Sequence, residues 1–326
     1  MSVKTTKDFF KPTNLISLLK KISGSTLIVV SSVVILRTFI LDWSVVPSGS
    51  MSNTFLIGDV VMYWKCAYGN FGLHSIPIIG HYFIDRRLSN TFIKKCNIRR
   101  GDIVVFAKHG AYLTKRVIGL PARKVNGKQV EGDLVEWNGL DLRINGKSTI
   151  FKPDGSTIGA PPKEYLLSKQ HSDSDRDIVM IQYEAFIPLD DGKHMKIKVL
   201  IEKKPPKYRW CRYRVPPGHV FVVGDNRPRR HSFDCREFLF GGDVPIASVN
   251  GRVFMRLFGS NSKVFKRERG LVKSILSFPL LITKYIAGLN LLRFGMIDKV
   301  RVKLEEFDYP KIPEEEYNII PVKNEK

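Results

Sequence analysis

The stretch Val46-Pro-Ser-Gly-Ser-Met-Ser-Asn-Thr54 decides how this chain is organised. It places two serines, Ser48 and Ser50, in a turn of small residues a few positions after an apolar segment. Further along, Tyr112-Leu-Thr-Lys-Arg-Val-Ile-Gly-Leu-Pro121 sets Lys115 beside apolar residues. A serine needs a base to become a nucleophile, and a lysine removed from water can serve as that base. The two blocks together predict a serine–lysine hydrolase at the edge of a membrane.

The segment before this turn has the composition of a membrane anchor. Gly24–Leu41 is apolar or small except for Arg37, which lies near one end, where its long side chain can reach the interface. A spanning helix needs roughly 20 mostly apolar residues, so the segment predicts one N-terminal transmembrane helix. A cleaved signal peptide is an alternative, because Pro47-Ser-Gly-Ser50 can imitate a cleavage site. A buried core helix is disfavoured because the run lacks a polar face.

Charge predicts the orientation of the anchor. Lys4, Lys7, Lys11, Lys20 and Lys21 precede the span, against a single acidic residue. Positive residues stay on the cytoplasmic side. The chain is therefore expected to be a single-pass protein of the inner (cytoplasmic) membrane, with its N-terminus in the cytoplasm and everything after the anchor on the extracytoplasmic or periplasmic side.

Length and charge limit the remaining possibilities. The chain has 326 residues, enough for one large domain after the anchor with an insertion and a tail. Its formal charge of +22 is a common sign of nucleic-acid binding. The basic residues are spread along the chain without a nucleic-acid motif, so we expect no nucleic-acid partner and favour attraction to an anionic membrane surface. A plain effect on solubility stays open.

Cysteine and histidine spacing predicts no metal and no cofactor. Cys66, Cys96, Cys211 and Cys235 include no Cys-x-x-Cys pair, and the seven histidines include no His-Glu-x-x-His run. Disulfides are possible on an oxidising side of the membrane, and their pairing is left open.

Beyond the serine turn the pattern is mostly that of β-strands. Gly58-Asp59 and Gly101-Asp102 each form a turn that precedes a short apolar run. The fold class predicted is mainly β, with an antiparallel sheet as the catalytic domain. Residues 153–177 are rich in Pro, Ser, Asp and Lys and predict an inserted polar loop. Further strands are expected over Tyr112–Leu120, Leu134–Ile144, Ile178–Ile187 and Met195–Glu202, and within Pro216–Arg227.

These blocks, in this order, resemble those of type I signal peptidases, the bacterial leader peptidase family. The resemblance covers roughly Ile35 to Val253 and implies a protease that removes signal peptides from exported preproteins, favouring small residues at the cleavage site. The matching stretches are Pro47-Ser-Gly-Ser-Met51, Arg100-Gly-Asp-Ile-Val-Val-Phe106, Lys115-Arg-Val-Ile-Gly-Leu-Pro121, Gly224-Asp-Asn-Arg227 and Ser232-Phe-Asp-Cys-Arg236.

The resemblance assigns a role to each of several residues. Ser50 matches the family nucleophile and Lys115 its general base. Ser48 matches the hydroxyl that helps the Ser50 backbone N–H stabilise the oxyanion, and Ser232 matches a residue that orients the lysine. Burial against apolar residues disfavours the charged form of a lysine, whose pKa in water is about 10.4, and so favours an amine that can accept the serine proton.

Other matching residues are expected to be structural. Asp234 and Arg236 match charges near the site. We interpret Asp225 and Arg227 as a structural salt bridge rather than as catalytic groups. Met51, beside the nucleophile, is expected to pack in the fold and to form part of the substrate cleft.

The chain also departs from the family pattern. Asn53 stands where the family usually has a proline, and Ala122-Arg123 where it has Gly-Asp. Losing that glycine is expected to change the turn after the lysine strand, since glycine permits a positive φ. Cys235 replaces a common serine, and Pro228-Arg-Arg-His231 lengthens the spacing before Ser232. These departures bear on substrate preference and rate.

The expected organisation is a cytoplasmic segment over 1–23, the anchor over 24–41, the catalytic domain over 42–258 and an extension over 259–326. Within the extension, the apolar run 271–292 is interpreted as an interfacial helix, with a second membrane segment and a packed helix as alternatives. Residues 305–326 are expected to form a flexible tail. The protein is expected to act as a monomer.

Two other functions stay open at this point. One is a related serine–lysine protease with a dedicated substrate, such as a pilin or a conjugation protein. The other is an inactive membrane-anchored relative, although both the nucleophile and the base are present. A self-cleaving repressor is disfavoured, because such a protein would carry a DNA-binding domain in place of the anchor.

Overall fold

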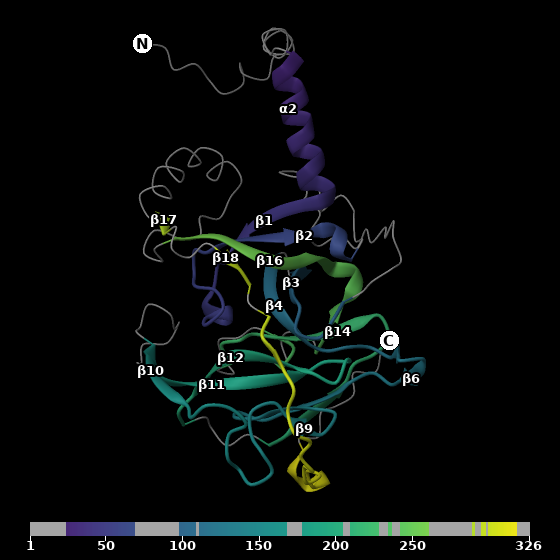
Figure 1. Ribbon diagram of the computed structural model, residues 1–326, viewed down its shortest axis with the longest axis vertical. Helices are drawn as coiled ribbons and strands as arrows, with labels where there is room; N and C mark the ends of the chain where they lie inside the picture. The colour runs from purple at the N-terminus through teal and green to yellow at the C-terminus, as the bar shows by residue number, and fades with distance from the viewer. Residues whose placement is uncertain are drawn as a thin grey trace, which may run out of the picture.

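A computed structural model gives the fold (Figure 1). It describes residues 24–68, 98–108, 111–167, 178–204, 209–227, 234–236, 242–260, 289–290, 295–297 and 299–317. The architecture is mainly β, with antiparallel sheets and one short α-helix in the described residues, which confirms the predicted class.

The helix α2 (Gly24–Ile35) projects from one end of the β domain (Figure 1). It continues into a π-helical turn, η2 (Leu36–Ile40), before the chain enters β1. Its apolar side chains, from Leu27 to Ile35, are mostly exposed. Among the residues that the structure describes, no helix reaches both the length and the apolar character needed to cross a membrane.

The largest sheet carries the segments that matter for the site. Its strand order is β1-β2-β16-β3-β4-β14-β15, with β17 and β18 also paired to β16, and its neighbours are antiparallel. These strands are β1 (Leu41–Val45), β2 (Val60–Trp64), β3 (Ile103–Lys108), β4 (Ala111–Gly119), β14 (His219–Val223), β15 (Val244–Pro245), β16 (Val249–Ser260), β17 (Leu289–Asn290) and β18 (Gly295–Met296).

The two predicted Gly-Asp turns each start a strand of this sheet. Gly58 and Gly101 both have φ of +87°, a conformation that glycine adopts without steric cost. In each turn the aspartate accepts a hydrogen bond from the backbone N–H three residues earlier, Leu56 to Asp59 at 2.8 Å and Arg99 to Asp102 at 3.1 Å. Local chemistry therefore fixes where β2 and β3 begin.

Three smaller sheets pack below the large one (Figure 1). Their orders are β10-β11-β12-β19, β13-β7-β8-β9 and β5-β6. The strands are β5 (Arg123–Val125), β6 (Lys128–Val130), β7 (Leu134–Trp137), β8 (Leu142–Ile144), β9 (Lys147–Ser148), β10 (Lys163–Leu167), β11 (Ile178–Pro188), β12 (His194–Glu202), β13 (Cys211–Arg214) and β19 (Arg301–Val302). Short 3₁₀ turns lie at η3 (Gly49–Met51), η4 (Lys65–Ala67), η9 (Ile246–Ser248) and η12 (Glu314–Glu316).

The predicted polar loop over 153–177 is wrong in its middle part. Lys163–Leu167 forms β10 and pairs antiparallel with β11, Tyr165 lying opposite Met180. The pairing partner lies beyond the polar Ser-Lys-Gln-His-Ser run, so the polar composition of the neighbourhood hid a short strand. Residues 168–177 lie outside the described part of the chain.

The predicted flexible tail is also wrong for its first part. Figure 1 shows the C-terminal segment running back along the domain. Tyr317 is buried, donates a hydrogen bond to Glu136, and forms a parallel bridge with Trp210. Arg212 adds an ion pair with Glu314 at 2.6 Å. The acidic and aromatic residues of this segment thus complement basic residues of β13. The apolar run 271–292 lies outside the described residues except for β17.

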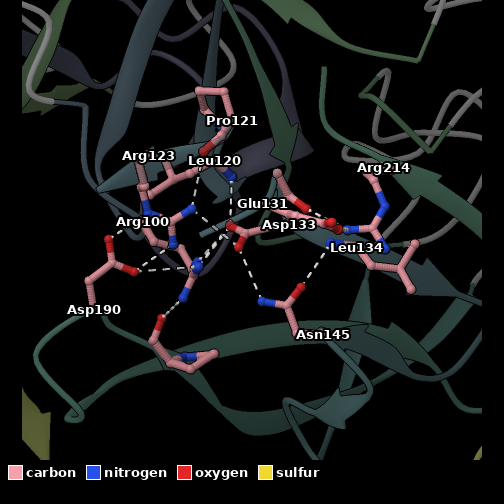
Figure 2. A network of polar contacts seen from close by, with 12 residues as sticks. Arg100, Leu120, Pro121, Arg123, Glu131, Asp133, Leu134, Asn145, Asp190 and Arg214 are labelled. Atoms are coloured by element: carbon pink, nitrogen blue, oxygen red, sulfur yellow. Dashed lines mark hydrogen bonds and ion pairs between the residues drawn. The ribbon is translucent and has the colours of Figure 1, made fainter. Parts of the chain in front are cut away.

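A buried polar network joins the large sheet to the β7 sheet (Figure 2). Asp133, whose side chain is fully buried, forms an ion pair with Arg100 at 2.7 Å. It also accepts hydrogen bonds from the Leu120 N–H at 2.7 Å and from Asn145 at 3.1 Å. Since a buried charge needs partners for its lone pairs, this network fixes how the end of β4 meets the turn after β8.

Candidate active site

The serine turn lies between β1 and β2. The Val46 N–H donates to Asp59 O at 2.8 Å, which closes the loop and holds its base. At its tip, η3 (Gly49–Met51) carries Ser50, which is 5% exposed. The hydroxyl oxygens of Ser48 and Ser50 lie 3.3 Å apart. The turn therefore holds the two predicted serines together, with Ser50 buried and Ser48 exposed.

The Gly224-Asp-Asn-Arg227 loop holds this turn from outside. The Asn226 N–H donates to Ser50 O at 3.0 Å, and the Asn226 side-chain amide donates to Gly49 O at 2.9 Å. Leu200 of β12 binds the loop in turn, donating to Asp225 O at 2.9 Å and accepting from Arg227 N at 2.8 Å. Asn226 therefore fixes two carbonyls of the serine turn, that of Gly49 through its side chain and that of Ser50 through its backbone N–H.

Lys115 lies in the middle of β4, opposite Val104 of β3. The η3 turn packs against β4. The Lys115 side chain is 1% exposed, among the largest fully buried side chains of the described residues. A lysine buried to this degree is uncommon, because desolvation disfavours its charge. The predicted nucleophile and the predicted base thus lie on two elements that contact each other.

Arg116, the next residue of β4, forms a buried ion pair with Asp225. Its Nε and Nη2 lie 2.9 Å and 2.7 Å from the two carboxylate oxygens, and the Thr54 hydroxyl also donates to Asp225. The predicted salt bridge between Asp225 and Arg227 is therefore wrong. The register of β14 against β4 sets Val223 opposite Arg116, and this brings the next residues of the loop toward β4.

Asp234 and Arg236 bind each other through two hydrogen bonds of 3.0 Å and 2.8 Å. Asp234 also accepts from the Gly224 N–H at 2.9 Å. Burial alone would raise the pKa of Asp234, but the charge and hydrogen bonds of Arg236, the charge of Lys115 and the Gly224 N–H hold it below its ordinary value. Asp234 therefore links the region of Lys115 to the start of the Gly224–Arg227 loop.

The remaining predicted site residues have different outcomes. Ser232 lies outside the described residues, so its relation to Lys115 stays a prediction. Met51 is 1% exposed and packs with Val46, Phe55 and Tyr63 in the smaller of the two apolar clusters. Its packing role is observed, and its part in a substrate cleft stays a prediction. Among the described residues, no cluster of His, Cys, Asp or Glu is placed to hold a metal ion.

The first departure from the family pattern, Asn53 in place of a proline, is explained by the backbone conformation at that residue. Asn53 has φ of +93°, in the left-handed region that asparagine tolerates better than most residues. A proline fixes φ near −65° and is incompatible with this conformation. The turn after Ser50 therefore follows a path that a proline at this position would not allow.

At the second departure, Ala122-Arg123, the side chain of Arg123 forms ion pairs. Arg123 binds Asp190 through two hydrogen bonds of 2.7 Å and 2.6 Å and lies 3.3 Å from Asp133 (Figure 2). The hydrogen bond from Arg123 and the charges of Arg100 and Arg123 lower the pKa of Asp190 against the opposing effect of burial. Ala122 is not among the described residues with positive φ, so the turn after β4 does not require glycine here.

The cysteine substitution is accommodated by the fold. Cys235 is buried, its Sγ accepts a hydrogen bond from the Val222 N–H at 3.2 Å, and burial raises the pKa of its thiol. Cys66, Cys211 and Cys235 are free thiols in the described part of the chain, and Cys96 lies outside it.

Sequence reasoning missed three residues that hold the site. Asn226, Arg116 and Thr54 were all inside or beside blocks that had been singled out, but no role had been given to them. The signal for Asn226 was its place between two charged residues in Gly224-Asp-Asn-Arg227. Nothing local marked Thr54, because its partner Asp225 is distant in the sequence.

Comparison with known proteins agrees with this arrangement. Residues 19–258 match the family described as "Signal peptidase, peptidase S26". Signal peptidase I of Buchnera aphidicola subsp. Schizaphis graminum (strain Sg) is 31% identical over 238 residues, covering 68% of this chain and 69% of that protein. Signal peptidase I of Rickettsia prowazekii (strain Madrid E) is 27% identical over 261 residues, covering 78% and 85%.

This chain belongs to the peptidase S26 family of signal peptidases. The family match contains the serine turn, β4 and the Gly224–Arg227 loop, and it ends at Phe258. The C-terminal segment that packs on the domain, residues 299–317, therefore lies outside the family match.

Proposed function

We propose that this signal peptidase is a membrane-anchored serine endopeptidase in which Ser50 is the nucleophile and Lys115 the general base, acting on the signal peptides of exported preproteins. One observation carries the catalytic assignment. The Ser48 and Ser50 hydroxyls lie 3.3 Å apart on a turn that packs against the strand carrying the buried Lys115.

The proposed chemistry is acyl transfer with a lysine base. A neutral Lys115 amine accepts the Ser50 proton as Oγ attacks the scissile carbonyl. The Ser50 N–H and the Ser48 hydroxyl donate to the oxyanion that develops, and each such donor can lower the barrier by roughly 3 kcal/mol. Lys115 then passes the proton to the leaving amine, and water attacks the ester in the second half of the reaction.

The residues that hold the serine turn support this role for Ser50. Asn226 binds the carbonyls of Gly49 and Ser50, which holds the backbone of the turn at the nucleophile. The Arg116–Asp225 pair joins β4 to the same loop. One rigid unit therefore carries the nucleophile, the oxyanion donors and the strand of the base, as a preorganised site requires.

The proposed anchor is Gly24–Leu41, with the N-terminus in the cytoplasm and the β domain on the extracytoplasmic side. Support comes from the exposed apolar surface of α2 and from the lysines that precede it. Arg37 and Asp42, 2.7 Å apart, lie where the helix gives way to β1, a place suited to the membrane–water interface. The net charge of +22 favours contact with an anionic surface.

The test is cleavage of a purified preprotein in detergent by wild type, Ser50→Ala and Lys115→Ala. Both variants are expected to lose cleavage by at least about 10³-fold. Ser52→Ala is the matched serine control, because Ser52 is buried in the same turn and its hydroxyl has no hydrogen-bond partner among the described residues. Lys124→Ala, on exposed β5, is the lysine control. Cleavage that survives in Ser50→Ala or Lys115→Ala contradicts the assignment.

A further inference from the structure

A pocket lined by Arg227, at the end of the Gly224–Arg227 loop, has no part in the proposed chemistry. It is small and partly open to solvent, with room for about one water-sized group. The pocket lies where the end of β7, the start of β13 and the Gly224–Arg227 loop meet. Its lining residues are Trp137, Asn138, Gly139, Arg209, Cys211, Arg227 and Arg236.

The buried groups of this pocket are hydrogen-bond donors that lack acceptors. Arg227 is 4% exposed, and its Nε and Nη1 have no hydrogen-bond partner within the part of the chain that the structure describes. The same holds for the indole Nε1 of Trp137. The side-chain oxygen Oδ1 of Asn138 already accepts hydrogen bonds from the N–H groups of Leu140 and Asp141. Arginine and tryptophan side chains can only donate, so the orphaned side-chain groups of Arg227 and Trp137 call for an acceptor.

Among the described residues, no carboxylate forms an ion pair with Arg227. Asp225, Asp234 and Asp141 attract its charge from a distance, but each of them is bound by another arginine, namely Arg116, Arg236 and Arg143. Burial and the charge of Arg236 lower the pKa of Arg227 to about 10 against the opposing effect of these three carboxylates, which leaves it positively charged near neutral pH. A buried charge without a partner is strongly unfavourable. A bound anion removes this penalty and satisfies the orphaned donors together.

We propose that this pocket binds a small inorganic anion, held by the Arg227 guanidinium and the Trp137 indole N–H. Chloride is the simplest ligand of this class. A neutral water satisfies donors but leaves the arginine charge unbalanced, so the anion is favoured over water. Because Arg227 is bonded to Leu200 and follows Asn226, the anion also steadies the loop that holds Ser50.

The test is thermal unfolding of the full chain in detergent, in sodium gluconate and in sodium chloride at equal ionic strength. In wild type, chloride is expected to raise Tm in a saturable way, by roughly 3–5 °C at ten times its Kd. Arg227→Met keeps the aliphatic volume and removes the charge, so its Tm is expected to be the same in both salts and, in gluconate, no lower than that of wild type. Trp137→Phe keeps the aromatic packing on Phe221 and removes a single donor, and it is expected to weaken the chloride response several-fold.

Arg214→Met is the control, because Arg214 is an exposed arginine paired with Glu131. It is expected to keep the full chloride response. Bromide soaked into crystals gives a second measurement, with an anomalous peak expected between Arg227 and Trp137. Equal Tm of wild type in the two salts, or a chloride response that persists in Arg227→Met, overturns the proposal. Neither result depends on peptidase activity, so the anion site stands or fails independently of the proposed function.

Discussion

The buried Arg116–Asp225 pair should be the most sensitive structural link in the site. Asp225 is 1% exposed and accepts hydrogen bonds of 2.9 Å and 2.7 Å from Arg116, with a further bond from Thr54. Asp225→Asn keeps the shape of the side chain but removes the charge. Arg116 would then be left as a buried cation without its carboxylate, a change that typically costs about 3–5 kcal/mol.

This cost translates into a clear shift of the unfolding temperature. For a domain of this size, each 1 kcal/mol lowers Tm by about 2–4 °C, so Asp225→Asn is expected to lower Tm by roughly 6–20 °C. Cleavage should fall as well, because Arg116 neighbours Lys115 and Asp225 neighbours the residue that binds Ser50 O. Differential scanning calorimetry in detergent measures the first effect, and preprotein cleavage measures the second.

The double variant Arg116→Met/Asp225→Asn separates a lost attraction from an orphaned charge. Since it removes the unpaired cation, it should be more stable than Asp225→Asn alone. Glu131→Gln, in the exposed pair with Arg214, is the control and should not change Tm measurably. The reasoning is refuted if Asp225→Asn unfolds at the same temperature as this control, or if the double variant is less stable than Asp225→Asn.

Three further predictions follow from particular residues. Asn53→Pro should lower the free energy of unfolding by about 1–3 kcal/mol, since proline cannot adopt φ of +93°. Asn53→Gly should lower it by no more than a few tenths of a kcal/mol. Urea unfolding compares the two variants, and equal midpoints would contradict the turn conformation. The pKa of Asp234 is lower in the folded chain than in the unfolded chain, so its contribution to stability is present above about pH 4 and is lost as pH falls below that. Urea unfolding from pH 6 to pH 3 should therefore show a smaller loss of stability for Asp234→Asn than for wild type, and parallel curves would argue against this linkage. Exposed Cys66 should react with a thiol reagent in the native chain, while buried Cys235, whose pKa is raised, should react only after unfolding. Peptide mass spectrometry distinguishes the two sites. Comparable labelling of both cysteines in the native chain would contradict the burial of Cys235.

Much of the β architecture follows from local sequence. The Gly-Asp turns before β2 and β3 carry both the glycine that permits a positive φ and the carboxylate that binds a nearby N–H. The runs that follow are rich in β-branched residues and are buried. Strand positions in this part of the chain were therefore predictable from residues within a few positions of each other.

The partner of Asp225 was not predictable in this way. Arg227 is two residues away and Arg116 is more than a hundred, and sequence proximity favoured the wrong one. The choice is made by the register of β14 on β4, which sets Val223 opposite Arg116. A pairing that depends on strand register cannot be deduced from the composition of either segment.

The prediction of a flexible C-terminal tail failed for a related reason. Its prolines and glutamates are typical of a flexible tail, but its glutamates and Tyr317 find complementary partners on β7 and β13. Arg212 pairs with Glu314, and Glu136 accepts from Tyr317. Only the folded domain brings these partners together at one surface.

The pairing of Ser50 with Lys115 is the central claim, and replacing the lysine amine tests it most directly. Lys115→Cys, in a background of Cys66→Ser, Cys96→Ser, Cys211→Ala and Cys235→Ser that leaves no other thiol, is alkylated while unfolded with bromoethylamine and refolded, which restores an amine less basic than that of lysine. The account predicts no cleavage before alkylation, and afterwards a return of preprotein cleavage with the acid limb of kcat/KM moved to lower pH. Full cleavage by unmodified Lys115→Cys, or restored cleavage with an unmoved acid limb, would contradict the assignment of Lys115 as the base.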